Sequence, residues 1–131
     1  MMIENIYGET TQDIQVEVIP IYVPDQSQFV NQYLYTYNIS ITNHSNQACQ
    51  LLRRHWIIVD GNGHREEVEG EGVVGEQPLL QPGECYQYSS YCPLATPTGN
   101  MRGSFLFVDS QGNEFNVKVP LFFLREDAII Q

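Results

Sequence analysis

The residues most suggestive of chemistry are three glycines with the spacing G-x-G-x-x-G: Gly70, Gly72 and Gly75. That spacing is typical of a loop that holds a dinucleotide's pyrophosphate, provided that a strand precedes the loop and a helix follows it. Pro78 and Pro82 come soon after the last glycine, and a proline inside a helix costs about 3 kcal/mol. We therefore expect no helix after this glycine loop (residues 70–78) and no dinucleotide site in it.

The charges around the loop also disfavour a phosphate. Five carboxylates surround the glycines, and Arg65 is the only nearby cation; the carboxylates are Glu66, Glu67, Glu69, Glu71 and Glu76. Each would repel a phosphate by about 1–3 kcal/mol at a separation near 6 Å. A divalent ion bridging loop and phosphate stays an alternative, and so does a recognition loop. The favoured interpretation is a corner where the chain crosses between sheets while Val73 and Val74 fill the core.

The same acidic segment offers ligands for a hard cation. Carboxylate oxygens suit hard divalent cations, and His64 lies beside Glu66 and Glu67, with Asp60 across the hairpin. A weak site for Mg²⁺ or Co²⁺ is therefore a hypothesis, with these ligands: Asp60, Glu67, Glu69 and Glu71. Glutamates on an exposed edge strand also form a solvated face that prevents sheet-to-sheet aggregation, and this is the favoured alternative. No other cofactor is expected.

The segment RRHW (53–56) precedes the acidic strand. Trp56 is expected to pack in the core, while Arg54 and His55 could bind the glycine loop or the strand containing YSS by hydrogen bonds, or could contact a ligand. On a regular strand successive side chains alternate, so Leu52, Trp56 and Ile58 share one face and look like core, while Leu51, Ile57 and Val59 make the opposite face nearly as apolar. The inward face of this strand therefore stays open, and a bulge near the arginines is one solution.

No pattern for catalysis stands out. Nucleophilic catalysis needs a serine or cysteine beside a base, with an oxyanion hole, and neither Ser90 nor Cys92 lies in a recognisable motif of that kind. The carboxylates cluster on one strand rather than facing each other across a cleft, as glycosidases require. We expect no enzyme. The three cysteines lack metal-ligand spacing and are expected to be reduced and largely buried.

Alternating polar and apolar residues recur along the chain, separated by turn residues. In YLYTYNISITN (33–43), for example, tyrosines and isoleucines share one face. We expect about seven antiparallel strands, at 14–22, 33–43, 49–60, 64–70, 85–92, 101–109 and 114–124. They predict one all-β domain over 1–131, a fibronectin type III-like or immunoglobulin-like β-sandwich with its core at about 14–124 and tails on either side. A β-barrel is the alternative.

Charge and hydropathy exclude several roles. The net charge is −10 and Lys118 is the only lysine, so the surface repels nucleic acid and anionic lipid. No apolar run has the length of about 18 residues that a membrane helix needs. The first residues do not resemble a signal peptide. We expect a cytoplasmic protein with no nucleic-acid partner and no membrane insertion.

Several motifs resemble the ApaG family in the family's order: RRHWIIVDGNG, EGEGVVGEQPLLQPGE, TPTGNMRGSF and QGNEFNVKVPLFFL. The similarity runs from about Ile14 to Leu124. It implies a fibronectin type III-like sandwich, a link to cobalt and magnesium resistance or efflux, and no established catalytic activity. Related domains in eukaryotic F-box and polymerase-interacting proteins imply a protein-binding module. Glu69 departs from the family, which often has a basic residue there.

We therefore expect a non-enzymatic cytoplasmic binding module with a protein partner, associated with divalent-cation homeostasis. The alternative is direct binding of a metal or metal–phosphate ligand at the glycine loop, and a third hypothesis is an enzyme acting on a nucleotide or polyphosphate. Homodimerisation stays open. For the partner or ligand loop, the residues singled out are Gly70, Gly72, Gly75, Arg54 and His55.

Overall fold

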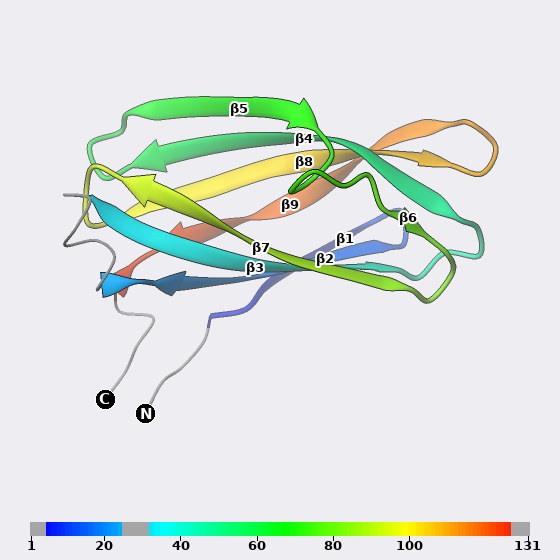
Figure 1. Cartoon of the computed structure of the whole chain (residues 1–131), viewed down its shortest axis with the longest axis horizontal. Helices are drawn as coiled ribbons and strands as arrows, with labels where there is room; N and C mark the ends of the chain where they lie inside the picture. The colour runs from blue at the N-terminus through cyan, green and yellow to red at the C-terminus, as the bar shows by residue number, and fades with distance from the viewer. Residues whose placement is uncertain (1–4, 25–31, 127–131) are drawn as a thin grey trace.

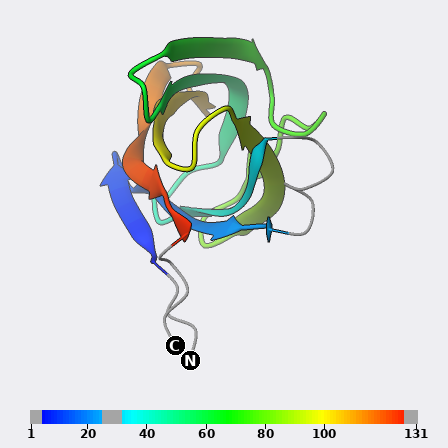
Figure 2. The same ribbon diagram turned by 90° about the vertical axis from the view of Figure 1, so that its left-hand side faces the viewer.

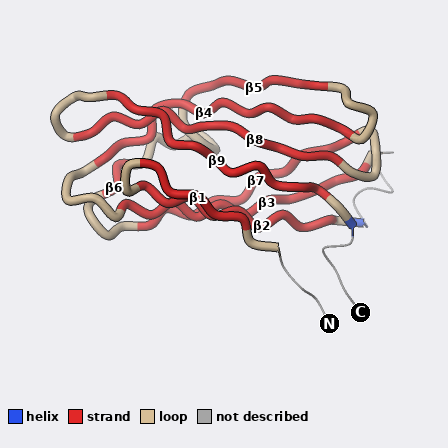
Figure 3. The backbone as a smooth tube through the Cα atoms, turned by 180° about the vertical axis from the view of Figure 1, so that it is seen from behind, coloured by secondary structure: helices blue, strands red, loops and turns tan. Residues whose placement is uncertain are grey.

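The computed structural model describes residues 5–24 and 32–126, and the elements that it defines there are strands (Figures 1 and 3). They are β1 (Tyr7–Thr11), β2 (Ile14–Tyr22), β3 (Tyr33–Asn43), β4 (Cys49–Asp60), β5 (Arg65–Glu71), β6 (Leu79–Leu80), β7 (Cys85–Leu94), β8 (Gly99–Asp109) and β9 (Glu114–Leu124). All seven predicted strands are present. Four of them have the predicted bounds; β7 and β8 each differ by two residues at one end, and β5 differs by one residue at both ends.

Two antiparallel sheets face each other as a sandwich, with the orders β1-β2-β3-β7 and β5-β4-β8-β9 (Figure 1). The short β6 adds to the second sheet by pairing with β4. No pairing joins the two sheets in the described part of the chain. The predicted sandwich is therefore confirmed, and the barrel is not formed.

The prediction of an N-terminal tail is wrong for part of that segment. Residues 7–11 form β1, which pairs with the whole first half of β2. The sequence YGETT alternates weakly and contains a glycine, so its apolar pattern is faint; only Tyr7 packs against the core, with its ring centroid 6.2 Å from that of Phe122. The expected tails at 1–4 and 127–131 lie outside the described residues.

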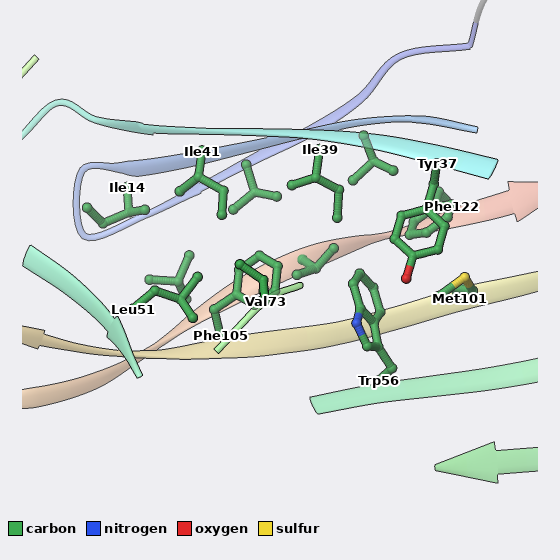
Figure 4. Packing of buried hydrophobic residues seen from close by; sticks show 14 of the residues in the cluster. Ile14, Tyr37, Ile39, Ile41, Leu51, Trp56, Val73, Met101, Phe105 and Phe122 are labelled. Atoms are coloured by element: carbon green, nitrogen blue, oxygen red, sulfur yellow. The ribbon is translucent and has the colours of Figure 1, made fainter. Parts of the chain in front are cut away.

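The core lies between the sheets and is built by the inward side of each alternating strand. Trp56 packs there against other aromatic rings: its ring centroid is 5.5 Å from that of Tyr37 and 6.0 Å from that of Phe122, both close to edge-to-face (Figure 4). Only 3% of Trp56 is exposed, so its predicted packing role is confirmed. Each large apolar side chain buried in this way contributes about 1.5–3 kcal/mol.

A β-bulge settles the ambiguous orientation of β4. The register with β8 shifts between Leu51 and Arg53, which leaves Leu52 unpaired. Leu51 faces the core before the bulge and Trp56 faces it afterwards, although a regular strand would place these two side chains on opposite faces. The extra residue thus turns Arg54 to the inward face and His55 to the outward face.

The two lateral sides of the sandwich differ. On one side β1 lies against β9, where the amide of Lys118 donates to Thr11 Oγ1 at 3.1 Å and Lys118 Nζ lies 3.8 Å from Glu9. The opposite side is bounded by β5 and β7, the other two edge strands (Figure 2). We call this the open side; the glycine loop lies on it.

Candidate functional site

The glycine loop is a tight corner followed by a strand. Gly72 has φ +63°, and a Cβ there would lie 2.2 Å from the carbonyl oxygen of Glu76, so no other residue fits. Val73 and Glu76 then exchange two backbone hydrogen bonds, of 2.8 and 2.9 Å, around a two-residue turn. The next element is β6 rather than a helix. Because β5 and β6 both pair with β4, the loop connects two strands of one sheet, and the expectation that the chain crosses between sheets here is wrong. The prediction that no helix follows the glycines is confirmed, and the loop lacks the helix N-terminus that a dinucleotide site requires.

The two valines of the loop differ in their burial. Val73 is 1% exposed and belongs to the core, as expected. Val74 was expected to do the same, and this is wrong: it is 54% exposed and has φ +44°. The cause is the turn, because Val74 and Gly75 are its two central residues and both need positive φ, as in a type I′ turn. A β-branched residue is strained in this conformation.

Arg54 binds the loop from β4. Its Nη1 donates to the carbonyl oxygens of Glu71, at 2.9 Å, and of Gly72, at 3.1 Å. Gly70 lies opposite Arg54 in the register, and its missing side chain leaves room for the guanidinium. The expected hydrogen bonds from Arg54 to the loop are thus present. Gln77 adds a second connection, since its side-chain amide donates to the carbonyl oxygen of the bulged Leu52 at 2.9 Å.

The amides of the loop are largely engaged within the protein. Gly72 donates to Leu52, and the amides of Val73 and Glu76 donate to each other's carbonyl oxygens. A phosphate-binding loop instead presents its N–H groups to the ligand. These three groups are therefore not available for a phosphate.

A pocket of about 380 Å³ opens beside the loop, between the edges of β5 and β7. Its inner wall includes Tyr37, Trp56 and Met101 of the core. Its rim includes two exposed side chains, Val74 from the loop and Tyr91, which is 68% exposed, from β7. Such a concave site with a few polar groups is the usual form of a binding site.

Burial controls the polar groups of the pocket. It raises the pKa of the Tyr37 hydroxyl, although a hydrogen bond with Ser90 opposes the change. It raises the pKa of Cys92 to about 12, so this thiol is protonated and unreactive at neutral pH. The Tyr88 hydroxyl is buried and has no hydrogen-bond partner among the described residues.

The other two cysteines lie outside the pocket. Cys49 is buried, as expected, whereas Cys85 was also expected to be largely buried and is exposed.

On the outer face of the β5-β4-β8-β9 sheet, a histidine contacts two carboxylates. His55 Nε2 lies 2.9 Å from Glu67 Oε2 and 3.6 Å from Glu69 Oε1. The hydrogen bond from His55, then that from Arg65, lowers the pKa of Glu67. His55 therefore contacts β5 rather than the glycine loop or β7.

The four residues predicted as metal ligands do not come together. Glu67 and Glu69 join His55, and one ligand atom from each of the three lies within 4.8 Å of the others. Asp60 instead lies at the β4–β5 hairpin, where Oδ1 accepts from the amides of Asn62, at 2.9 Å, and His64, at 3.0 Å. Glu71 lies opposite Arg53 in the register.

The side-chain partners of His44 and His55 in the described part of the chain are an amide and carboxylates, not a hydroxyl or a thiol. His44 Nε2 lies 2.7 Å from Gln15 Oε1, and His55 binds the carboxylates of β5. Within residues 5–24 and 32–126, no histidine ring is hydrogen-bonded to a hydroxyl or a thiol. Over the same residues, no helix is long and apolar enough to span a bilayer.

Sequence reasoning missed three features of the candidate site: the hydroxyl of Tyr88, which has no hydrogen-bond partner among the described residues, the strained turn at Val74 and the amide of Gln77. Of these three, only Gln77 could have been singled out from the sequence, because it belongs to the motif GEGVVGEQP. The other two depend on which side chains the fold leaves without partners, and periodicity does not show that.

The two-layer arrangement, with its glycine corner closing on β4, is that of a fibronectin type III-like β-sandwich. The family model described as "ApaG domain" matches residues 24–109, and the chain belongs to this family. A protein named "Protein ApaG" from Methylocella silvestris is 46% identical over 91% of this chain and 92% of its own. One of the same name from Acidovorax sp. is 50% identical over 86% and 82%.

A solved structure shows the same fold. The crystal structure of "the Putative ApaA Protein from Bordetella pertussis" superposes with a TM-score of 0.83. It is 47% identical in sequence, over 86% of this chain and 93% of that one. The fold expectation from the sequence and the family resemblance therefore agree with the comparisons.

Proposed function

We propose that this protein is a non-enzymatic binding module that holds an extended, basic segment of a partner protein on its open side. The observation that carries the proposal is a contrast between the two edge strands there. Five of the seven residues of β5 (REEVEGE) are charged, whereas β7 (CYQYSSYCPL) has no charged residue. Charges on an edge strand prevent pairing with another chain, so β7 is the unprotected edge.

Added strands bind through backbone hydrogen bonds along such an edge, and pockets for side chains supply specificity. The pocket beside β7, with Tyr91 and Val74 exposed at its rim, supplies such a place. The strain at Val74 supports the same assignment, because strained residues persist at binding sites where the surroundings hold them. The glutamates of β5 favour a partner with basic residues.

A capture experiment tests this function. Immobilised protein is incubated with an extract of its source cells, and bound proteins are quantified by mass spectrometry for the wild type, Tyr91→Lys and Leu121→Lys. Leu121 is the matched control, because it is an exposed apolar residue of an edge strand on the other lateral side. We expect a basic partner that is retained by the wild type and by the Leu121 variant, is lost with Tyr91→Lys, and dissociates as salt increases. Identical sets from all three baits would contradict the proposal.

The link to divalent-cation homeostasis is carried over from the family resemblance, and the cytoplasmic location is the expectation from the sequence. A second copy of the chain is the alternative occupant of the open side. Sedimentation of the wild type and of Tyr91→Lys distinguishes it, because self-association through β7 would be lost in the variant.

A second candidate function is direct binding of a divalent cation at His55, Glu67 and Glu69. Their ligand atoms lie close enough to share one ion, and an imidazole with two carboxylates suits Co²⁺ better than Mg²⁺. Calorimetric titration with CoCl₂ tests this, comparing the wild type with His55→Ala and with His64→Ala. Saturable heat lost only in His55→Ala would support the site, and no saturable heat in the wild type would exclude it.

A further inference from the structure

The register of β7 shows which of its backbone groups are free. The amide of Asn43, where β3 ends, donates to the carbonyl oxygen of Glu84, the residue before β7, at 3.0 Å. Because hydrogen-bonded and non-bonded pairs alternate in an antiparallel ladder, the even-numbered residues of β7 exchange their hydrogen bonds with β3. The odd-numbered residues turn their amide and carbonyl groups to the free edge, where β7 has no neighbouring strand among the described residues. Pro93 is odd-numbered, so its missing N–H removes no bond to β3, and it ends the run of donors along this edge.

The inner side of this edge adjoins the pocket. Side chains of the even-numbered residues of β7 point into the sandwich, as the burial of Cys92 and Leu94 shows. Side chains of a strand added to β7 would lie on the same side as the residues that they face, so every second one would point inward. There they would contact Val68 of β5 and Val74 of the glycine loop, which line the pocket together with Tyr88. Apolar side chains suit most of these inward positions.

One carboxylate of β5 faces the pocket. Glu66 is opposite the partly buried Ile58 in the register, which places it on the inner face, whereas Glu67 is on the outer face with His55. Glu66 lines the pocket together with Cys92, and burial, followed by the charge of Glu66, raises the pKa of that thiol. In the part of the chain that the structure describes, Glu66 forms no ion pair. A basic side chain facing Cys92 would therefore find an unpaired carboxylate.

A cation has no such partner further along β7. Arg54 also lines the pocket, and it is opposite Gly70, four residues beyond Glu66 on β5. Burial raises the pKa of the Tyr88 hydroxyl and the charge of Arg54 opposes the rise, which places this positive charge towards Tyr88. A basic side chain at that point would be repelled. The charge beside β7 thus changes from negative near Cys92 to positive near Tyr88.

We propose that the partner segment is an antiparallel strand on the free edge of β7, with a lysine or arginine facing Cys92 and uncharged apolar residues two and four positions later, facing Ser90 and Tyr88. This pattern rests on the proposed protein-binding function and deepens it, because it names the segment that the open side holds. The antiparallel direction is the more stable form of ladder, and it is the form of every pairing in this sheet. Valine and other β-branched residues suit the two apolar positions.

Two synthetic peptides of the same composition test the pattern: acetyl-SKTVTVTS-amide, which has the proposed order, and acetyl-STVTVTKS-amide, which has the reverse order. When the reverse peptide lies in the same direction with its valines facing inward, its lysine faces Tyr88 rather than Cys92. Each peptide is titrated into the full-length protein and followed by ¹H–¹⁵N correlation spectra. Glu66→Gln removes the inward carboxylate. Glu67→Gln is the matched control, because it removes one charge from the outer face of the same strand.

We expect the proposed order to bind about fivefold more tightly than the reverse, because it gains one exposed ion pair and avoids one like-charge contact. Glu66→Gln should reduce this preference to about twofold, and Glu67→Gln should leave it at about fivefold. Absence of saturable shifts with the proposed order would overturn the pattern. Equal affinity of the two peptides, or a preference that Glu66→Gln leaves unchanged, would overturn it as well.

Hydrogen exchange tests the pairing with β7 itself. The amides of Gln87, Ser89 and Tyr91 point to the free edge, so the bound peptide should slow their exchange. The amide of Tyr88, which is bonded to β3, should change little. Saturable binding without slower exchange at the three outward amides would overturn the added strand.

The capture experiment separates this result from the proposed function. If a basic partner is lost with Tyr91→Lys while the two peptides bind equally, only the pattern fails. If capture does not depend on Tyr91, the proposed function fails, whichever peptide binds.

Discussion

The guanidinium of Arg54 occupies the space that a side chain at Gly70 would need: a Cβ at Gly70 would lie 2.9 Å from Arg54 Nη2. The two residues are direct neighbours across β4 and β5. Arg54 faces inward only because the bulge at Leu52 shifts the strand by one residue. The glycine of the motif and the arginine of RRHW therefore form one structural unit, which holds the corner of the open side.

Gly70→Ala is expected to lower the free energy of unfolding by about 1–3 kcal/mol, because the guanidinium must move away from two carbonyl oxygens. Arg54→Met removes the same hydrogen bonds, so the double variant should cost little more than either single one. Urea unfolding of the three variants measures this. Gly8→Ala is the control, since a Cβ at Gly8 makes only ordinary contacts. Strictly additive losses would show that the two residues act independently.

Val74→Asn is expected to raise the free energy of unfolding by about 1 kcal/mol, because asparagine tolerates the positive φ that valine resists. The same substitution removes an exposed apolar side chain from the pocket rim, so it should weaken partner capture. Thermal unfolding and capture, measured on one preparation, give both results. A destabilised variant would mean that the turn does not strain Val74.

Tyr88→Phe is expected to stabilise the unliganded protein by about 1 kcal/mol, since it removes a buried hydroxyl that has no partner among the described residues. Chemical denaturation compares it with Tyr86→Phe, which should change stability little. A loss of stability in Tyr88→Phe would show that the hydroxyl is satisfied in the unliganded protein.

The pH dependence of stability should report on the contact between His55 and Glu67. The folded state lowers the pKa of Glu67 below its ordinary value of 4.5, with the His55 hydrogen bond as the largest cause. The carboxylate therefore contributes stability above pH 4.5, and this contribution is lost as the pH falls through the lower folded pKa.

His55→Ala should raise the pKa of Glu67 towards 4.5, as measured by NMR titration of its carboxyl carbon. The stability of this variant should fall below that of the wild type above pH 4.5 and approach it in acid. His44→Ala, whose side chain contacts Gln15 instead, is the control. An unchanged Glu67 titration in His55→Ala would contradict the assignment.

The fold could be predicted from the sequence where alternation was strong, as in β3, whose inward residues Tyr35, Tyr37, Ile39 and Ile41 are all buried. The prediction failed for β1, which is short and weakly apolar, and for β6, which has only two residues. The inward face of β4 could not be assigned, because the bulge shifts the alternation by one residue. Odd-numbered positions such as Leu51 face the core before the bulge, and even-numbered positions such as Trp56 face it afterwards. A period-two pattern has no means of showing where one residue is unpaired.

The candidate site was predictable only in part. The link between Arg54 and the glycine loop was one of the alternatives that the sequence left open, and the absence of a helix followed from the prolines. The grouping of His55 with Glu67 and Glu69 depends on cross-strand register, and the pocket depends on the distance between two sheet edges. Neither of these can be read from spacing along the chain.

The central claim is that the open side, at β7, is where a partner binds. A photoreactive benzoylphenylalanine in place of Tyr91 tests it most directly, with the same group in place of Leu121 as the control. Irradiated with an extract of the source cells, the protein labelled at position 91 should form a discrete adduct that excess wild-type chain competes away and excess Tyr91→Lys chain does not. An adduct that forms equally at position 121, or that Tyr91→Lys competes as well as the wild type, would contradict the claim.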